Sequence, residues 1–333
     1  MNRPLLRLTL GMLALFALAD LIWLPFSELT VDPGTVRAVG AVIATLLIIA
    51  GGCALVMRRL EGDDSRIAEI LRRAAKGTVH VSLAGTALML ATPLMVVNNY
   101  LMMAVGLPFE DAALAAADRA LGFDWLGFLA FVDARPWMAA LMVVVYGSSL
   151  TQMLGVVFVL GALSRTRALQ EFVALYLVTG AMVSLIAMGV PAIGAYAYWQ
   201  PDPAMHDLLT GAGTVHLAHL EALRAGTFTQ DFGPLEIASS VGLVTFPSFH
   251  TVLAIIVPFA FRGIPALFWP LALLNALVLV STLPEGGHFL IDVFAGAAVA
   301  LAAIAVVRWI GDGAQFGLSK NAPRAHVASA AER

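Results

Sequence analysis

The sequence predicts an all-α fold, a polytopic bundle of about eight membrane-spanning helices. Of its 333 residues, 60% are hydrophobic and 12% are charged, and the mean hydropathy is +0.88. Soluble domains carry roughly 25% charged residues, so this chain has too much apolar surface to enclose in one core. Its apolar residues also gather in runs of about 20, the length of a helix that crosses a bilayer.

The apolar runs follow one another along the chain. The first begins after Arg3 and Arg7, and we expect a retained span because no small-residue cleavage site precedes Leu24. The lone cysteine, Cys53, excludes an intramolecular disulfide and a CxxC site. Polar residues 146–152 in the fourth run are expected to pack helices together. The expected spans lie near residues 5–26, 36–57, 78–104, 138–163, 168–190, 247–262, 264–283 and 289–310.

Composition divides the chain into three parts. Residues 1–77 form an N-terminal extension of two spans with a basic cytoplasmic loop. Residues 78–310 form the membrane core, with an outer cap at 191–246. Residues 311–333 are a polar, alanine-rich tail that we expect to be disordered and cytoplasmic.

Charged residues in the connections predict the orientation. Residues 58–76 are rich in arginine, and short basic loops stay in the cytoplasm. Counting spans from that loop places both termini in the cytoplasm. Residues 108–133 then lie outside, where their acidic and apolar side chains predict interfacial helices, and a short cap helix is expected near 214–225. The chain is thus predicted to be a multi-pass protein of a bacterial cytoplasmic (inner) membrane. Its net charge of -3 and the lack of a basic stripe predict no nucleic-acid partner.

Two short segments carry histidines where a connection enters an apolar run. Residues 245–250 read Thr-Phe-Pro-Ser-Phe-His, and residues 285–292 read Glu-Gly-Gly-His-Phe-Leu-Ile-Asp. The predicted topology places both segments at the outer side of the membrane. Because they could have fallen on opposite sides, their common location favours one shared site.

The second segment has the features of a nucleophile. The glycines before His288 let backbone approach a ligand closely, and a helix that begins there favours an anion. Asp292, one turn further on, can accept the proton of one ring nitrogen and leave the other as a lone pair. Two other interpretations remain open: a His–Asp helix cap without chemistry, and a metal pair that His216 and His219 could complete. We expect no metal.

The first segment has the features of an acid and base. Pro247 suits the first turn of a helix, and Ser248 with the following amides can bind phosphate oxygens. His250 then lies in the first turn, where it can protonate a leaving oxygen and later accept a proton. The alternative is an interfacial or capping histidine.

These residues resemble a known family. Pro247-Ser248-Phe249-His250 resembles the Pro-Ser-x-His signature of the type-2 phosphatidic acid phosphatase superfamily, and residues 281–292 resemble its last motif. The chain looks most similar to the inositol phosphorylceramide synthase-like (inositolphosphotransferase) branch, most specifically over 224–300. The resemblance implies a six-helix phosphatase-like core, a phosphohistidine on His288, an orienting Asp292 and an acid/base at His250, with no cofactor.

The chain also departs from that pattern. Thr282 stands where the last motif has an arginine, and the first motif is not recovered. A transferring phosphoryl group carries negative charge that needs a cation. Arg224 is the candidate we expect to bind phosphate together with Ser248 and Gly287, although a solvated interfacial charge is an alternative. Arg119 and Arg135 are weaker candidates.

The sequence therefore predicts a membrane lipid phosphatase or phosphotransferase. Its expected substrate is a lipid phosphate or phosphodiester at the outer leaflet. Water, or a lipid or polyol alcohol as acceptor, would resolve the phosphohistidine, with transfer of an inositol phosphate-like head group as the transferase version. The alternative function is a non-enzymatic transporter or lipid-binding protein in which the His–Asp pair couples protons.

Overall fold

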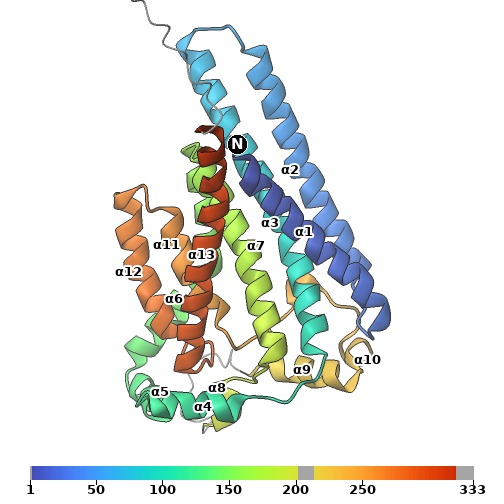
Figure 1. Cartoon of the computed structure of the whole chain (residues 1–333), viewed down its shortest axis with the longest axis vertical. Helices are drawn as coiled ribbons and strands as arrows, with labels where there is room; N and C mark the ends of the chain where they lie inside the picture. The colour runs from blue at the N-terminus through green and yellow to red at the C-terminus, as the bar shows by residue number, and fades with distance from the viewer. Residues whose placement is uncertain (1, 202–213, 320–333) are drawn as a thin grey trace, which may run out of the picture.

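The computed structural model describes residues 2–201 and 214–319, which form a bundle of long helices (Figure 1). These residues contain no β-strand, and extended backbone pairs only in the isolated bridge between Val31 and Leu235. In this part of the chain, six helices are long and apolar enough to cross a membrane, and two further apolar helices are shorter. The long helices are α1 (Arg3–Trp23), α2 (Pro33–Arg59), α3 (Arg66–Met103), α6 (Pro136–Ala162), α7 (Thr166–Gly189) and α13 (Leu290–Ser319); the shorter ones are α11 (Phe249–Ala260) and α12 (Pro265–Ser281).

Each predicted apolar run overlaps one of these helices, which confirms the all-α, polytopic fold. Polar residues next to the runs determine where the helices begin. The side chains of Asn2, Asp32 and Ser65 accept backbone N–H bonds at the starts of α1, α2 and α3, and proline occupies the first turn of α2 and α6.

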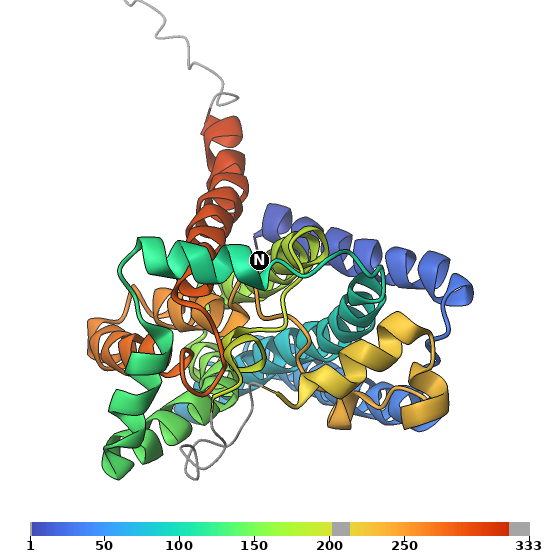
Figure 2. The same ribbon diagram turned by 90° about the horizontal axis from the view of Figure 1, so that it is seen from below.

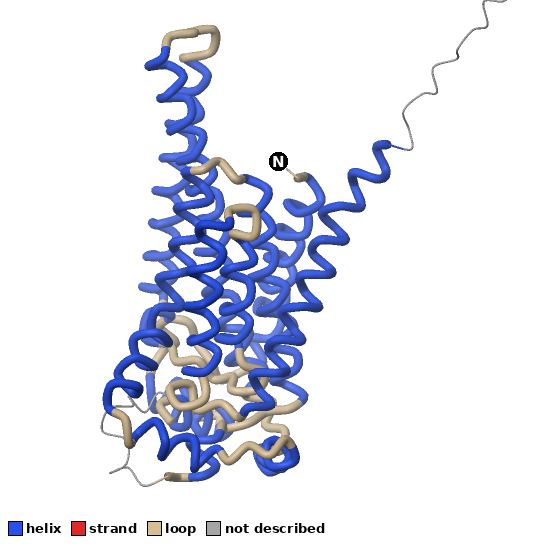
Figure 3. The backbone as a smooth tube through the Cα atoms, turned by 90° about the vertical axis from the view of Figure 1, so that its left-hand side faces the viewer, coloured by secondary structure: helices blue, strands red, loops and turns tan. Residues whose placement is uncertain are grey.

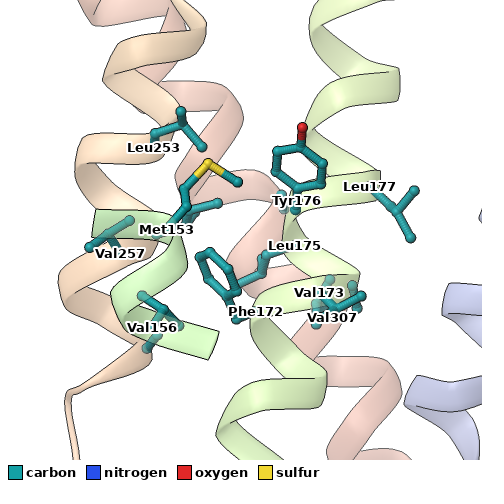
Figure 4. Close-up of a cluster of buried hydrophobic side chains, with 14 of the residues drawn as sticks. Met153, Val156, Phe172, Val173, Leu175, Tyr176, Leu177, Leu253, Val257 and Val307 are labelled. Carbon is teal, nitrogen blue, oxygen red and sulfur yellow. The ribbon is translucent and has the colours of Figure 1, made fainter. Parts of the chain in front are cut away.

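Helix α7 lies at the centre of the bundle, in contact with α1, α3, α6, α11 and α13. Phe172 and Leu175 of α7 share a buried cluster with Met153 of α6, Val257 of α11 and Val307 of α13 (Figure 4). Since lipid is as apolar as these side chains, close packing rather than exclusion from water holds the spans together. Helix α2, in contrast, packs mainly against α3.

The two ends of the bundle differ in composition. The basic turn between α2 and α3 projects beyond the other helices at one end (Figures 1 and 3). Short helices lie across the opposite end, where α13 begins (Figures 1 and 2). They are α4 (Asp111–Ala120), α5 (Trp125–Asp133), α8 (Ala195–Trp199), α9 (His216–Ala225) and α10 (Phe228–Phe232). The helices expected within 108–133 and near 214–225 are therefore present.

Two boundaries differ from the prediction. The basic connection expected over 58–76 is helical from Arg66, because Ser65 caps α3 and Glu69 pairs with Arg73 one turn later. Helix α13 continues to Ser319 and so includes the first residues of the segment expected to be a tail from 311. The remainder of that tail, 320–333, and part of the predicted cap, 202–213, lie outside the described residues.

Candidate active site

His288 and Asp292 form a buried pair where the chain enters α13. The Nδ1 atom of His288 lies 3.2 Å from Oδ2 of Asp292, and the two side chains are 4% and 0% exposed. The same carboxylate oxygen accepts the backbone N–H of Phe289 at 3.0 Å. A carboxylate in this position holds the proton of His288 on Nδ1 and leaves Nε2 with a lone pair for bond formation.

The two glycines before His288 are required by the geometry. A Cβ atom on Gly286 would lie 2.7 Å from His288 Cδ2 and 2.7 Å from the carbonyl oxygen of Thr282. Gly287 has a φ of 60°, in the left-handed region that glycine adopts without strain, and its carbonyl accepts the N–H of Ala195 at 2.7 Å. The turn therefore wraps tightly around the imidazole.

His250 lies in the first turn of α11, two residues after the N-cap residue Ser248, whose hydroxyl accepts the N–H of Thr251. Its Nδ1 atom is 3.1 Å from the hydroxyl of Tyr146 in α6, and the two rings stack with centroids 4.2 Å apart at 27°. Each catalytic candidate thus has its own partner, a carboxylate for His288 and a phenol for His250.

The two histidine segments meet through a close backbone contact between α11 and α13. The N–H of Ser248 donates to the carbonyl of Asp292 at 3.1 Å. A Cβ on Gly296 would lie 2.4 Å from the carbonyl oxygen of Ser248, so only glycine permits this approach. As a result, His250 and His288 are close enough to interact electrostatically.

Two carboxylates of α4 hold the connections around the site. Asp118 accepts the N–H groups of Leu290 and Ile291 at 2.8 and 2.9 Å, and Asp111 accepts those of Ile193 and Gly194. Both aspartates are 3% exposed, and burial raises the pKa of each carboxyl although the amide bonds oppose the rise. They lie two turns apart on one face of α4, a spacing that the sequence contained but that sequence reasoning did not use.

Further groups surround His288. Burial lowers the pKa of His288 to about 4, and the backbone carbonyl of Thr245 partly opposes this shift. Trp125 donates its indole N–H to the carbonyl of His288 at 3.0 Å. His216 is 4% exposed, lies close enough to His288 to interact electrostatically, and its Nε2 atom is 2.8 Å from the carbonyl of Ile193. Burial lowers the pKa of His216 as well.

The alternative interpretation of His288 and Asp292 was a metal site. Within the described part of the chain, no group of three or more His, Cys, Asp or Glu side chains could hold a metal ion. His219 instead lies beside Tyr100, with its Nδ1 atom 3.1 Å from the phenol hydroxyl.

The arginine candidates lie apart from the histidines. Arg224 stacks over Phe109, with its guanidinium carbon 3.6 Å from the ring centroid, and lines a cavity to which none of the histidine-site residues contributes. Arg119 lies over Trp199 and Arg135 over Phe131, at 5.8 and 3.7 Å. Within the described residues, no Arg makes a hydrogen bond or ion pair to His250, His288 or Asp292.

A separate cavity of about 210 Å³ opens beside His250, between α3, α7 and residues 241–244. Its wall is mostly apolar, with two polar pairs: Asn99 donates to Ser184 at 3.0 Å, and the hydroxyls of Thr92 and Tyr176 are 3.2 Å apart. An apolar chamber next to an acid/base suits a ligand with an aliphatic part.

Comparison with known proteins agrees with this geometry. A family model described as the PAP2 superfamily matches residues 112–306, more than half of the chain and both histidine segments. Neither a search of curated proteins nor a search of solved structures finds a match. Members of that superfamily are phosphatases and phosphotransferases, and the apolar helices make this chain an integral membrane protein. The chain belongs to the PAP2 superfamily.

Proposed function

We propose that this protein is a membrane lipid phosphatase or phosphotransferase that works through a phosphohistidine on His288. The buried His288–Asp292 pair next to His250 carries the proposal. A neutral imidazole with one nitrogen paired and the other available is a nucleophile for phosphorus, and a second imidazole nearby can handle the proton.

In the first step, Nε2 of His288 attacks the phosphorus of a lipid phosphate or phosphodiester. The bond from phosphorus to the leaving alcohol oxygen breaks, and His250 transfers a proton to that oxygen. Asp292 stabilises the positive charge that develops on the His288 ring. The equatorial phosphate oxygens are bound by N–H groups at the start of α11 after Ser248 and by the turn at Gly287, because the first N–H groups of a helix have no partner within it.

In the second step, a hydroxyl compound attacks the phosphohistidine. The P–N bond breaks, and His250 accepts the proton of the attacking hydroxyl. Water as the attacking group makes the protein a phosphatase. A lipid or polyol alcohol makes it a phosphotransferase, of which the inositolphosphotransferase reaction is the version that the sequence resemblance favours.

Tyr146 positions His250 in this proposal. Its hydroxyl can donate to Nδ1 when the imidazole is neutral and accept from it when the imidazole is charged. A phenol therefore orients His250 in both protonation states, whereas the carboxylate next to His288 favours the cation. The different partners suit an acid/base and a nucleophile respectively.

The site is proposed to face the outer leaflet. The histidine segments lie at the end with the short helices, and the arginine-rich connection lies at the opposite end. Basic connections remain in the cytoplasm, which supports an outer location for the histidines and cytoplasmic termini.

The test uses the purified full-length protein with lipid phosphates labelled with 32P in the phosphate. Wild-type protein is expected to release label or transfer it to an alcohol, with products identified by mass spectrometry, and to form an acid-labile, base-stable protein label. His288→Ala is expected to abolish turnover and labelling. His80→Ala is the matched control, because His80 bonds to Thr166 at the other end of the bundle. Equal turnover by His288→Ala would disprove the nucleophile assignment.

A further inference from the structure

A second cavity, of about 330 Å³, lies between the N-terminal extension and the cap. Its walls come from residues 23–29, the end of α3 and residues 223–228. Glu28 and Arg224 are the charged side chains among the described residues that line it, and they form no ion pair with each other. The wall of the cavity therefore contains one positive and one negative residue that do not neutralise each other directly.

Arg224 is incompletely satisfied. Its Nε and Nη2 atoms are buried and have no hydrogen-bond partner in the described part of the chain. Burial lowers the pKa of this guanidinium, which reflects the free-energy cost of holding the cation there. The ring of Phe109 covers the guanidinium and offsets part of that cost. An anion bound in the cavity beside this guanidinium would offset part of that cost by its charge.

Glu28 is held close by. The carbonyl of Glu28 accepts the hydroxyl of Thr229 at 2.6 Å, and the N–H of Leu235 donates to Thr30 at 2.7 Å, so the segment is tied to the cap on both sides. The Cγ atom of Glu28 lies 3.8 Å from the place where a Cβ on Gly226 would be, two residues from Arg224. The carboxylate thus belongs to the same cavity as the guanidinium.

The surroundings of the cavity are those of a membrane surface. Trp23 and Phe26 line it at the end of the first span, and Phe26 is 86% exposed. Aromatic side chains at the end of a span lie at the level of lipid head groups. A ligand that carries a phosphate and an ammonium group and is anchored at this depth is a zwitterionic phospholipid.

We propose that this cavity binds the head group of a phospholipid with a primary ammonium, its phosphate on Arg224 and its ammonium toward Glu28. None of the site histidines lines this cavity; His250 lines the neighbouring one, and the two cavities share Tyr100 in their walls. It ties the N-terminal extension, which precedes the family match, to the cap through a lipid. The inference goes beyond the proposed function and does not depend on it.

The test measures the melting temperature of the purified full-length protein against short-chain phospholipids. The lipids are dihexanoyl phosphatidylethanolamine, phosphatidylglycerol and phosphatidylcholine, with free phosphoethanolamine and inorganic phosphate as water-soluble probes. Wild-type protein is expected to be stabilised most by phosphatidylethanolamine. Arg224→Gln should weaken the apparent affinity for that lipid about tenfold or more, as expected for the loss of charge-assisted hydrogen bonds. Glu28→Gln should remove the preference for ethanolamine over glycerol while binding persists.

Arg135→Gln is the matched control, because Arg135 also lies over a phenylalanine but donates its own hydrogen bond to the carbonyl of Phe131. It should respond to lipid like the wild type. His288→Ala should do so too, which separates this site from the reaction. Stabilisation by the lipid but not by phosphoethanolamine identifies a membrane lipid as the ligand, and an equal effect of phosphoethanolamine identifies a soluble head group. An unchanged lipid response in Arg224→Gln, or an unchanged ethanolamine preference in Glu28→Gln, would overturn the proposal.

Discussion

Replacing Gly286 by alanine is expected to displace the imidazole of His288. The new Cβ would lie 2.7 Å from His288 Cδ2 and 3.2 Å from Nε2. Carbon atoms in contact are about 3.5–4.0 Å apart, so the overlap is about 1 Å. The backbone cannot yield easily, because the carbonyl of Thr282, 2.7 Å from the same Cβ, accepts the N–H groups of Gly286 and His288 at 3.0 and 3.3 Å. The ring must therefore move from the position in which it pairs with Asp292.

The magnitude follows from the size of that movement. A misplacement of about 1 Å in a catalytic group can lower a rate about 100-fold, which corresponds to ~2.7 kcal/mol of transition-state stabilisation. We therefore expect the single-turnover rate constant for phosphate release from a labelled lipid phosphate to fall about 100-fold. The melting temperature, measured on the same preparation, shows whether the variant remains folded.

Gly147→Ala is the matched control for this substitution. Gly147 lies in α6 next to Tyr146, and a Cβ there meets no atom within 4 Å. Alanine at this position should leave activity unchanged, since it favours the helix and touches nothing. If Gly286→Ala is folded and retains activity within about threefold of the control, the argument that this turn positions His288 is wrong.

Three further predictions concern the partners of the site. Tyr146→Phe keeps the stacked ring but removes the hydroxyl that bonds to His250. The loss of this hydrogen bond should lower kcat about tenfold with little change in KM. An unchanged kcat would exclude a positioning role for Tyr146. Burial lowers the pKa of His288 to about 4, so the imidazole keeps its lone pair above that pH. We therefore expect kcat/KM to fall as the pH drops through about 4. Activity that is constant down to about pH 3 would exclude His288 as the nucleophile. Asp118→Asn leaves one carbonyl oxygen for two N–H groups at the start of α13. It should destabilise the protein by about 1–3 kcal/mol in thermal unfolding. The control substitution Asp133→Asn should not destabilise it.

The predicted spans agree with the structure because their signals are local. A run of about 20 apolar residues is long enough for a helix to cross a bilayer, and its length is read from the sequence without knowledge of its neighbours. Cap residues such as Ser65 and the glycine pair before His288 act within a few positions of themselves. The pairing of His288 with Asp292 is of this kind too, since a spacing of four residues joins side chains within one turn.

The partners of His250 could not be predicted in this way. Tyr146 lies 104 residues from His250, in a polar cluster that the sequence suggested would pack helices. Asp118 contacts α13 across 172 residues. Nothing in the spacing of such residues distinguishes them from other polar groups in or beside apolar helices, because contact depends on how the helices pack.

Arg224 shows most clearly the difference between what the sequence predicts and what helix packing decides. The sequence alone determined that it lies in the cap on the side of the histidines, because topology follows from the order of spans and basic loops. The tertiary structure decided which cavity it lines, because α9 places its guanidinium over Phe109 and places Arg224 in the cavity that Glu28 lines, to which His250 does not contribute. Hydrophobic length thus determines where the apolar helices of this chain lie, and the residues next to the apolar runs place the two histidines at helix starts. Only the packing of helices far apart in sequence decides which side chains share a site.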